Sequence, residues 1–192
     1  MISKDEALKI VRKYIKTENT VKHMIALEAI MKALAQRFEP EKEAEWAMAG
    51  LLHDLDYEQF KNNDYSQHGK KTVELLKKEA VDLPDSVYQA IQAHCWGISN
   101  EFAKPANKME WSIFISDSLT GLIVATTLVR PDKKLASVEV KSIMKKFKNT
   151  SFAAGTRRED IKLCQEKLGI PLPEFIGIGL AAMQKISDEL GL

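Results

Sequence analysis

One short stretch constrains this chain more than any other. Gly50-Leu51-Leu52-His53-Asp54-Leu55-Asp56 follows an apolar run that begins at Trp46 and predicts a buried helix ending in an adjacent imidazole and carboxylate. Burying a charged carboxylate beside a histidine is costly unless another group compensates it. A divalent cation would compensate both, because neutral imidazole and ionised carboxylate are ligands that zinc, manganese and iron accept. The stretch therefore predicts part of a metal site whose other ligands come from elsewhere.

The composition of the chain fits a cytoplasmic globular protein. The 192 residues are 45% hydrophobic and 29% charged with a net charge of +1, so the chain is not a polyanion binder by charge alone. Cys95 and Cys164 are the only cysteines and lack a paired spacing, which fits a reducing compartment. No secretory signal is apparent, and no apolar run approaches the roughly 20 residues of a membrane span. We therefore expect a cytoplasmic protein with no membrane partner.

Apolar residues recur at helical spacing along the whole chain, and alternating strand patterns are absent. Capping residues, prolines and glycines divide this pattern into separate helices. The helices are expected over residues 3–16, 20–38, 40–54, 67–80, 84–95, 107–129, 137–147, 157–168 and 173–190. Loops are expected over residues 56–65 and 97–104. The predicted fold class is all-α.

The four histidines, His23, His53, His68 and His94, each fall at or near the end of an expected helix. A single histidine is usually a surface residue or a satisfied core residue, but four in such settings are not independent of one another. Asp117 lies among apolar neighbours inside the longest expected helix. An inward carboxylate there needs a partner. Asp117 either completes a ligand set or accepts hydrogen bonds from a neighbouring helix.

The ordered set of these histidines with Asp54 and Asp117 resembles the HD superfamily of metal-dependent phosphohydrolases, in its variant with two extra histidines before the final aspartate. Further stretches resemble a narrower group of uncharacterised predicted hydrolases of that superfamily. Those stretches are residues 21–24, 49–57, 120–125, 129–131, 145–148 and 152–155. The resemblance implies an HD-type metal-binding helical domain over residues 1–130. Residues 131–192 would form a C-terminal helical extension packed on the same domain.

The resemblance also implies two groups of metal ligands that share Asp54. They are His23, His53, Asp54 and Asp117 for the first ion, and Asp54, His68 and His94 for the second. The expected cofactors are two divalent ions of iron or manganese, with zinc, cobalt, nickel or magnesium as substitutes. Two ions about 3.5–4 Å apart can clamp the attacking and leaving oxygens of a phosphoryl displacement. A metal-activated water would then be the nucleophile.

Two carboxylates and a basic segment supply the remaining candidate residues. Asp54 and Asp56 are the expected catalytic residues. Asp56 orients the nucleophile or a ligand, or it only caps the turn that follows. Residues 130–148 carry seven basic and two acidic side chains, which form either a solvated face or part of a phosphate site. The expected phosphate contacts are Arg130, Lys146, Lys148 and Arg158.

The leading function is a phosphomonoesterase or phosphodiesterase that acts on a nucleotide or another small phosphorylated metabolite. A hydrolase of nucleic acid is a second hypothesis, which the modest net charge disfavours. A di-iron oxygenase of the HD type is a third, because the same ligand set would serve iron. A non-catalytic regulatory module is a fourth, and the complete ligand set argues against it. An oligomer is compatible with the sequence.

Overall fold

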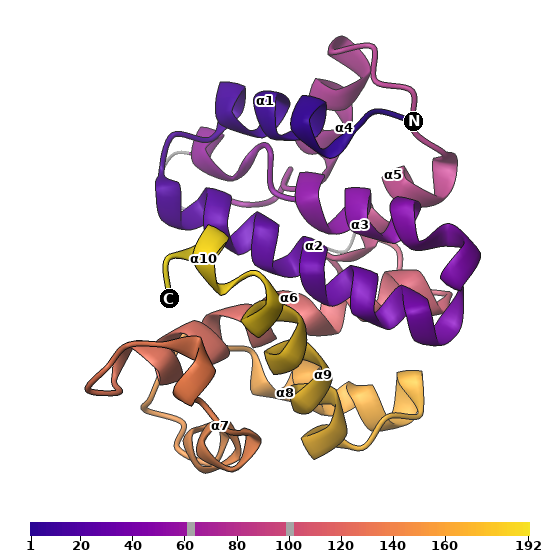
Figure 1. The fold of residues 1–192 in the computed structure, drawn as a ribbon. Coiled ribbons are helices and arrows are strands. Elements are labelled where there is room, and N and C mark those ends of the chain that lie inside the picture. Colours follow the sequence, from indigo (N-terminus) through magenta and orange to yellow (C-terminus); the bar gives the residue numbers. More distant parts are fainter. Residues whose placement is uncertain (61–63, 99–101) are drawn as a thin grey trace.

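Helices make up the computed structural model, which describes residues 1–60, 64–98 and 102–192 and contains no β-strand within them (Figure 1). The predicted all-α class is therefore confirmed. The helices are α1 (Lys4–Tyr14), α2 (Glu18–Phe38), α3 (Glu43–Leu52), α4 (Lys70–Lys78), α5 (Asp85–Ala93), α6 (Lys108–Leu128), α7 (Val140–Phe147), α8 (Arg158–Leu163), α9 (Leu172–Lys185) and α10 (Ser187–Leu190). Parts of the two expected loops, residues 61–63 and 99–101, lie outside the described residues.

The start of the first helix agrees with the expected one, whereas two other expected helices are interrupted. At the start of α1 the Ser3 hydroxyl accepts from the Glu6 N–H, and the Glu6 carboxylate accepts from the Ser3 N–H, as the capping pattern predicts. The helix expected from residue 40 begins with a separate 3₁₀ turn, Pro40–Lys42, before α3. The last expected helix is divided at Ile186 into α9 and α10. The sequence therefore located the helices but missed these interruptions.

Helices α2 and α3 cross at backbone contact. A Cβ added at Gly50 of α3 would lie 2.9 Å from the Leu27 carbonyl and from the Glu28 nitrogen of α2. A glycine is needed here because any side chain would push the two helices apart. This close crossing fixes the end of α3, where the His53-Asp54 pair begins.

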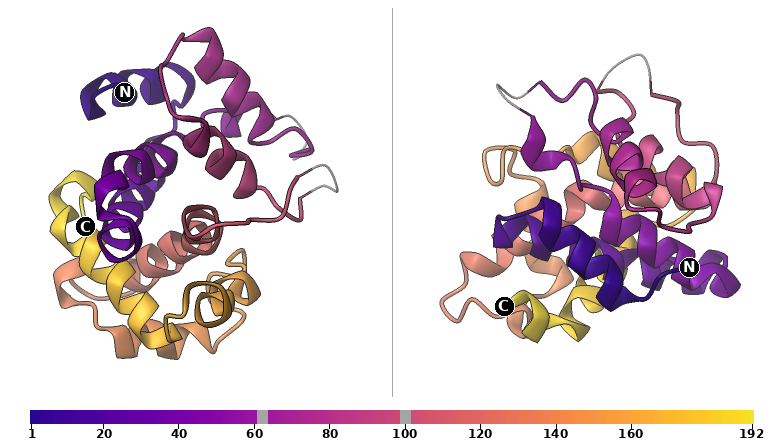
Figure 2. Two further views of the ribbon diagram at one scale, coloured as in Figure 1. Left: turned by 90° about the vertical axis from the view of Figure 1, so that its right-hand side faces the viewer. Right: turned by 90° about the horizontal axis from the view of Figure 1, so that it is seen from above.

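Helix α6 lies across the centre of the molecule and packs against α2, α5, α7, α8 and α9 (Figure 2). It is long and apolar enough to cross a membrane by length and composition, so the expectation that no segment approaches that length was wrong. However, 67% of its most apolar window is buried inside the protein. Packing in the core thus accounts for its composition without a membrane.

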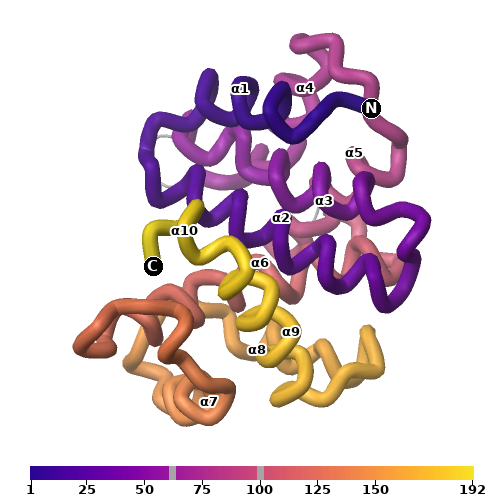
Figure 3. Tube along the Cα trace, in the orientation of Figure 1, coloured from indigo at the N-terminus to yellow at the C-terminus, as the bar shows by residue number. Residues whose placement is uncertain are grey.

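The C-terminal helices lie on the side of α2 and α6 that faces away from α1, α4 and α5 (Figures 1 and 2). Helix α9 packs on both α2 and α6, and α10 returns to α2 (Figure 3). One core cluster extends from Ala7 in α1 to Leu190 in α10. The segment after residue 130 therefore shares the hydrophobic core of the preceding segment, while the exact division at residue 130 stays a prediction.

Candidate metal centre

Five helices bring the expected ligands to one place. His23 lies on α2, His53 and Asp54 follow the last residue of α3, His94 follows α5, and Asp117 lies on α6. His68 precedes α4 and is separated from it by a single residue, Gly69, whose φ of 79° few other residues adopt. Because helix ends present side chains along the helix axis as well as sideways, these ends converge on one point.

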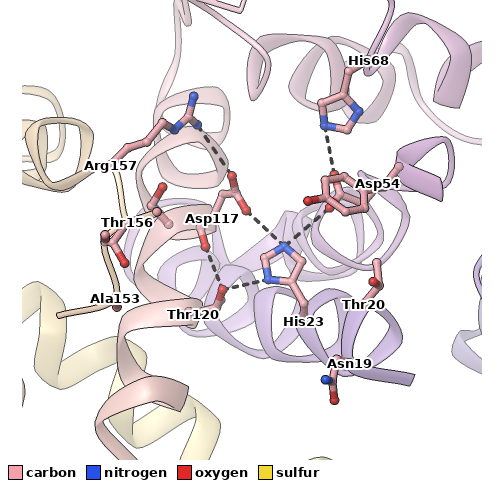
Figure 4. Close-up of a pocket in the computed structure, with 15 residues that line it drawn as sticks. Asn19, Thr20, His23, Asp54, His68, Asp117, Thr120, Ala153, Thr156 and Arg157 are labelled. Carbon is pink, nitrogen blue, oxygen red and sulfur yellow. Dashed lines mark hydrogen bonds and ion pairs between the residues drawn. The ribbon is translucent and has the colours of Figure 1, made fainter. Parts of the chain in front are cut away.

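The Asp54 carboxylate lies at the centre of the histidines. Its Oδ1 is 3.2 Å from His68 Nε2, 3.3 Å from His53 Nε2 and 3.5 Å from His94 Nε2. Its Oδ2 is 3.7 Å from His23 Nε2 (Figure 4). All four histidines therefore direct the same ring nitrogen, Nε2, toward one carboxylate.

The ligands form two groups on either side of Asp54. In one group, His23 and His53 have their Nε2 atoms 3.2 Å apart, and Asp117 Oδ1 lies 3.1 Å from His23 Nε2 and 3.9 Å from His53 Nε2. In the other group, the Nε2 atoms of His68 and His94 are 3.1 Å apart. The structure thus brings together all six residues expected as ligands. We call them the histidine wall.

Hydrogen bonds to backbone carbonyls fix the tautomers of two histidines. His53 Nδ1 lies 2.9 Å from the Gly50 carbonyl oxygen, and His94 Nδ1 bonds to the Ile91 carbonyl oxygen. A carbonyl oxygen can only accept, so Nδ1 carries the hydrogen in both rings. In the neutral imidazole Nε2 then has a free lone pair, and this lone pair is directed to Asp54.

Side-chain acceptors do the same for the other two histidines. The Thr120 hydroxyl donates to the Asp117 backbone carbonyl at 2.7 Å, so its oxygen accepts from the His23 Nδ1–H at 2.8 Å. His68 Nδ1 donates to Asp56 Oδ1 at 2.7 Å. Outer hydrogen bonds of this kind orient metal-binding imidazoles and raise their basicity. Four Nε2 lone pairs therefore face inward.

This donor set fits divalent metal ions. Ligand atoms held about 2.0–2.1 Å from one ion lie about 2.8–3.4 Å from each other in octahedral or tetrahedral geometry. The closest contacts within the two groups, 3.1 Å and 3.2 Å, match that spacing. Two neutral Nε2 atoms at such distances repel each other unless a cation or a proton lies between them.

The pKa values show how strongly the cluster attracts positive charge. Burial raises the pKa of the Asp54 carboxyl, but His53, His68 and His94 outweigh it and hold this pKa well below its ordinary value. Burial lowers the pKa of His94, but the effect of Cys95 and Asp54 is larger than that of burial, and the pKa of His94 is raised to about 10. Asp54 therefore stays ionised, and positive charge is held next to it. A metal ion supplies that charge without protonating the ligands.

A cavity of about 570 Å³ opens beside the histidine wall. His23, Asp54, His68 and Asp117 line one part of it, and the loop of residues 153–157 lines another (Figure 4). We call residues 153–157 the loop wall and the space between the two walls the metal cavity. Its size is typical of sites for small molecules.

Arg157 is the cation that the loop wall brings to the metal cavity. Its Nη2 lies 3.7 Å from Asp117 Oδ2, and its Nε bonds to Asp160 at 2.9 Å. The guanidinium packs 5.3 Å from the centre of the Phe114 ring, and 38% of the side chain is exposed. Arg157 also lines a smaller adjoining cavity of about 230 Å³ with Tyr57. It is therefore fixed and still accessible.

Arg158 was expected to contact phosphate, but it does not line the metal cavity. Its side chain is buried, and the guanidinium donates hydrogen bonds to backbone carbonyls of the surrounding loop. These carbonyls belong to Phe147, Asn149, Phe152, Ala153 and Thr156. Because its donors are used in this way, Arg158 holds the backbone of this loop in place. Its neighbour Arg157 lines the cavity instead.

The other three basic candidates also lie outside the described lining of the metal cavity. Arg130 Nε donates to the Ser137 hydroxyl at 2.6 Å. Lys146 lies 4.4 Å from the centre of the Phe152 ring, and Lys148 is exposed. The basic segment is thus largely solvated, which is one of the two interpretations that the sequence allowed.

Asp56 has a supporting position and no place in the described cavity lining. It is fully buried, and besides binding His68 it accepts from the Gly69 N–H at 2.8 Å and the Thr72 N–H at 3.0 Å. Asp56 therefore orients a ligand and holds the start of α4, whereas its side chain makes no capping hydrogen bond to the turn that follows it, Tyr57–Gln59, so the expected capping of that turn was wrong. The geometry replaces the expected catalytic role with a positioning role.

Three residues at the centre were not singled out from the sequence. Thr120 follows Asp117 by one helical turn, a spacing that indicates a shared face. Cys95 is next to His94, and its Sγ lies 3.3 Å from His94 Nε2. Arg157 has no such signal, because the sequence does not distinguish it from Arg158.

Comparison with known families agrees with this geometry. The family model described as HD domain matches residues 20–122, which is more than half of the chain. All six residues of the histidine wall lie within that match. No solved structure matches the chain.

Proposed function

The chain belongs to the HD family of metal-dependent hydrolases, and from this premise we propose that it is a phosphohydrolase with a binuclear metal site. One observation carries the proposal: four Nε2 lone pairs with fixed tautomers converge on the ionised Asp54 at the edge of a cavity. The proposed substrate is a nucleotide or another small phosphorylated metabolite.

The residues of the histidine wall would hold two ions in two groups. His23, His53 and Asp117 would hold one, His68 and His94 would hold the other, and Asp54 lies between the groups. Bound divalent ions supply Lewis-acid polarisation of phosphoryl oxygens and lower the pKa of water. The chain's own contribution is to fix the donors in advance: Thr120, Asp56 and two backbone carbonyls hold the rings before any ion arrives.

The residues of the loop wall favour the proposal of a phosphorylated substrate. Arg157 offers a planar guanidinium beside Asp117, and arginine recognises phosphate oxygens through paired hydrogen bonds. The adjacent Ala153, Ala154 and Gly155 are small, which leaves room for a ligand between the walls. A cavity of about 570 Å³ suits a small molecule better than a nucleic-acid strand.

The test combines metal analysis with a substrate screen. Protein purified without added metal is analysed for bound ions, then stripped and reloaded with Mn²⁺, Fe²⁺, Co²⁺, Zn²⁺ or Mg²⁺. Hydrolysis of phosphomonoesters and phosphodiesters should depend on the metal and disappear in Asp54→Ala. Asp82→Asn is the control, because this carboxylate is 98% exposed. A metal-free protein with full activity would refute the proposal.

The di-iron oxygenase is the competing function, because histidine and carboxylate ligands also serve iron. The same preparations distinguish the two. A hydrolase is active without oxygen and with several divalent ions. An oxygenase requires iron and consumes oxygen, and its iron centre has a characteristic spectrum in the mixed-valent state.

A further inference from the structure

A second cavity of about 410 Å³ adjoins the metal cavity. Asn19, His23, Thr120 and Gly121 line both cavities. His23 is also a member of the histidine wall, so a ligand at the metal centre lies against the boundary between the two spaces. The second cavity is therefore connected with the site and is not a separate surface feature.

The chemistry of this second space differs from that of the metal cavity. Its apolar side chains come from α2, α6 and the C-terminal residues. They are Ala26, Val124, Leu128, Leu190 and Leu192. Leu128, one of these side chains, is 48% exposed. We call this space the apolar cavity, and Lys22 adds a positive charge to its lining.

Gly121 lines both cavities and so lies where they adjoin, a boundary that we call the connection. It lies within α6, where glycine lowers helix stability relative to alanine. Its backbone does not have a positive φ, and a Cβ added there would meet nothing within 4 Å. Neither backbone geometry nor packing within the chain explains a glycine at this position. The glycine leaves room at the boundary between the two cavities.

We propose that the apolar cavity binds an apolar group of the substrate, so that the enzyme acts on phosphate esters with an alkyl or aryl portion next to the phosphoryl group. The inference rests on the proposed function. The phosphoryl group lies between the histidine wall and Arg157, and the apolar group passes Gly121 toward Val124 and Leu128. Continuity with the metal cavity favours a part of the substrate over a separate partner.

The first experiment measures binding without turnover. Methylphosphonate and octylphosphonate, the latter below its micelle concentration, are titrated into Mn²⁺-loaded protein by calorimetry. Each methylene that enters the apolar cavity should tighten binding about fourfold. Equal affinity for the two phosphonates, or binding of neither, would overturn the proposal.

Two substitutions at one position locate the effect. In Gly121→Leu the new side chain fills the connection, so the affinity ratio of octylphosphonate to methylphosphonate should fall toward one. Gly121→Ala also removes the glycine but leaves the connection open, so it should retain most of the ratio. Gly177→Ala in α9 is the control outside both cavities, where an added Cβ meets only Val140 at 3.6 Å. A ratio that survives in Gly121→Leu would contradict the assignment.

A second readout separates this inference from the proposed function. In hydrolysis of methyl, butyl and octyl phosphate, KM should fall with chain length in the wild type and not in Gly121→Leu. If no ester is hydrolysed while the phosphonate ratio persists, the proposed function fails and the apolar subsite stands. If the protein is a dimer that dissociates in Gly121→Leu and shows no chain-length preference, the face belongs to a second copy and the subsite is wrong.

Discussion

The two walls of the metal cavity are built in opposite ways. The histidine wall consists of side chains within or next to helices that are anchored in the hydrophobic core, and each ring has its own outer hydrogen bond. The loop wall has no helix of its own, and the buried guanidinium of Arg158 donates hydrogen bonds to two of its backbone carbonyls, those of Ala153 and Thr156. Damage to the first wall should remove metal, whereas damage to the second should remove substrate binding and leave the metal in place.

The largest effect should come from the centre of the histidine wall. Asp54→Asn keeps the shape and one carbonyl oxygen but loses the charge that offsets two cations. Metal content should fall, and kcat should drop on the order of a thousandfold or more. Elemental analysis and hydrolysis of a phosphomonoester measure the two effects. A variant that keeps both its metal and its activity would remove the binuclear mechanism.

Loss of a single ligand of the second group should have a smaller effect on metal content and activity than the change at Asp54. His68→Ala or His94→Ala should reduce the bound metal from about two ions toward one, because the first group keeps its own donors. Stoichiometry measured by elemental analysis tests this directly. Unchanged stoichiometry in both variants would mean that these histidines bind substrate or only pack.

Loss of the Asp56 carboxylate, which accepts from His68, should lower metal affinity less than loss of His68 itself. Asp56→Asn weakens the acceptor for His68 Nδ1–H, and loss of such a partner typically costs about 10–100-fold in metal affinity or activity. A titration with Mn²⁺ measures the affinity. Asp56 also caps α4, so thermal unfolding of the metal-free variant serves as the control for a purely structural loss.

The loop wall should give the complementary result. Arg157→Ala should raise KM for a phosphorylated substrate on the order of tenfold while the metal content stays at the wild-type value. Arg158→Ala should raise KM too, because the backbone that places Arg157 loses its anchor. Loss of metal in Arg157→Ala would show that the two walls do not act separately.

The smallest effect is expected at Thr120. Thr120→Val removes the hydroxyl that accepts from His23, so His23 can adopt either tautomer and metal affinity should fall by about tenfold or less. Thr120→Ser restores the hydroxyl and should restore the affinity. A Ser variant as weak as the Val variant would point to packing and not to the hydrogen bond.

The sequence places each member of the histidine wall on or beside an expected helix by local patterns, whereas their grouping into one ligand set came from the resemblance to the HD superfamily. Each ligand is at or near a helix end or, like Asp117, inside an apolar helix, and such positions follow from capping residues and periodicity. The close crossing at Gly50 and the interruption at Ile186 depend on tertiary packing, and no local pattern encodes them.

The loop wall is the part that sequence reasoning misplaced. Arg157 and Arg158 are identical in type and adjacent, and only the fold decides which guanidinium is buried. The carbonyls that Arg158 binds come from residues 147–156, so its role depends on how that segment closes on itself. A count of basic residues cannot contain this information.

The arrangement of the ligands links the folding stability of the protein to the supply of metal. The two ions expected at this centre would together link five helices between residues 23 and 117 and act as conditional cross-links. Folding stability would then follow the supply of free metal, gaining about 2.7 kcal/mol at a concentration one hundred times the dissociation constant. Metal starvation would therefore increase the unfolded fraction and the rate of proteolytic turnover as well as stopping catalysis.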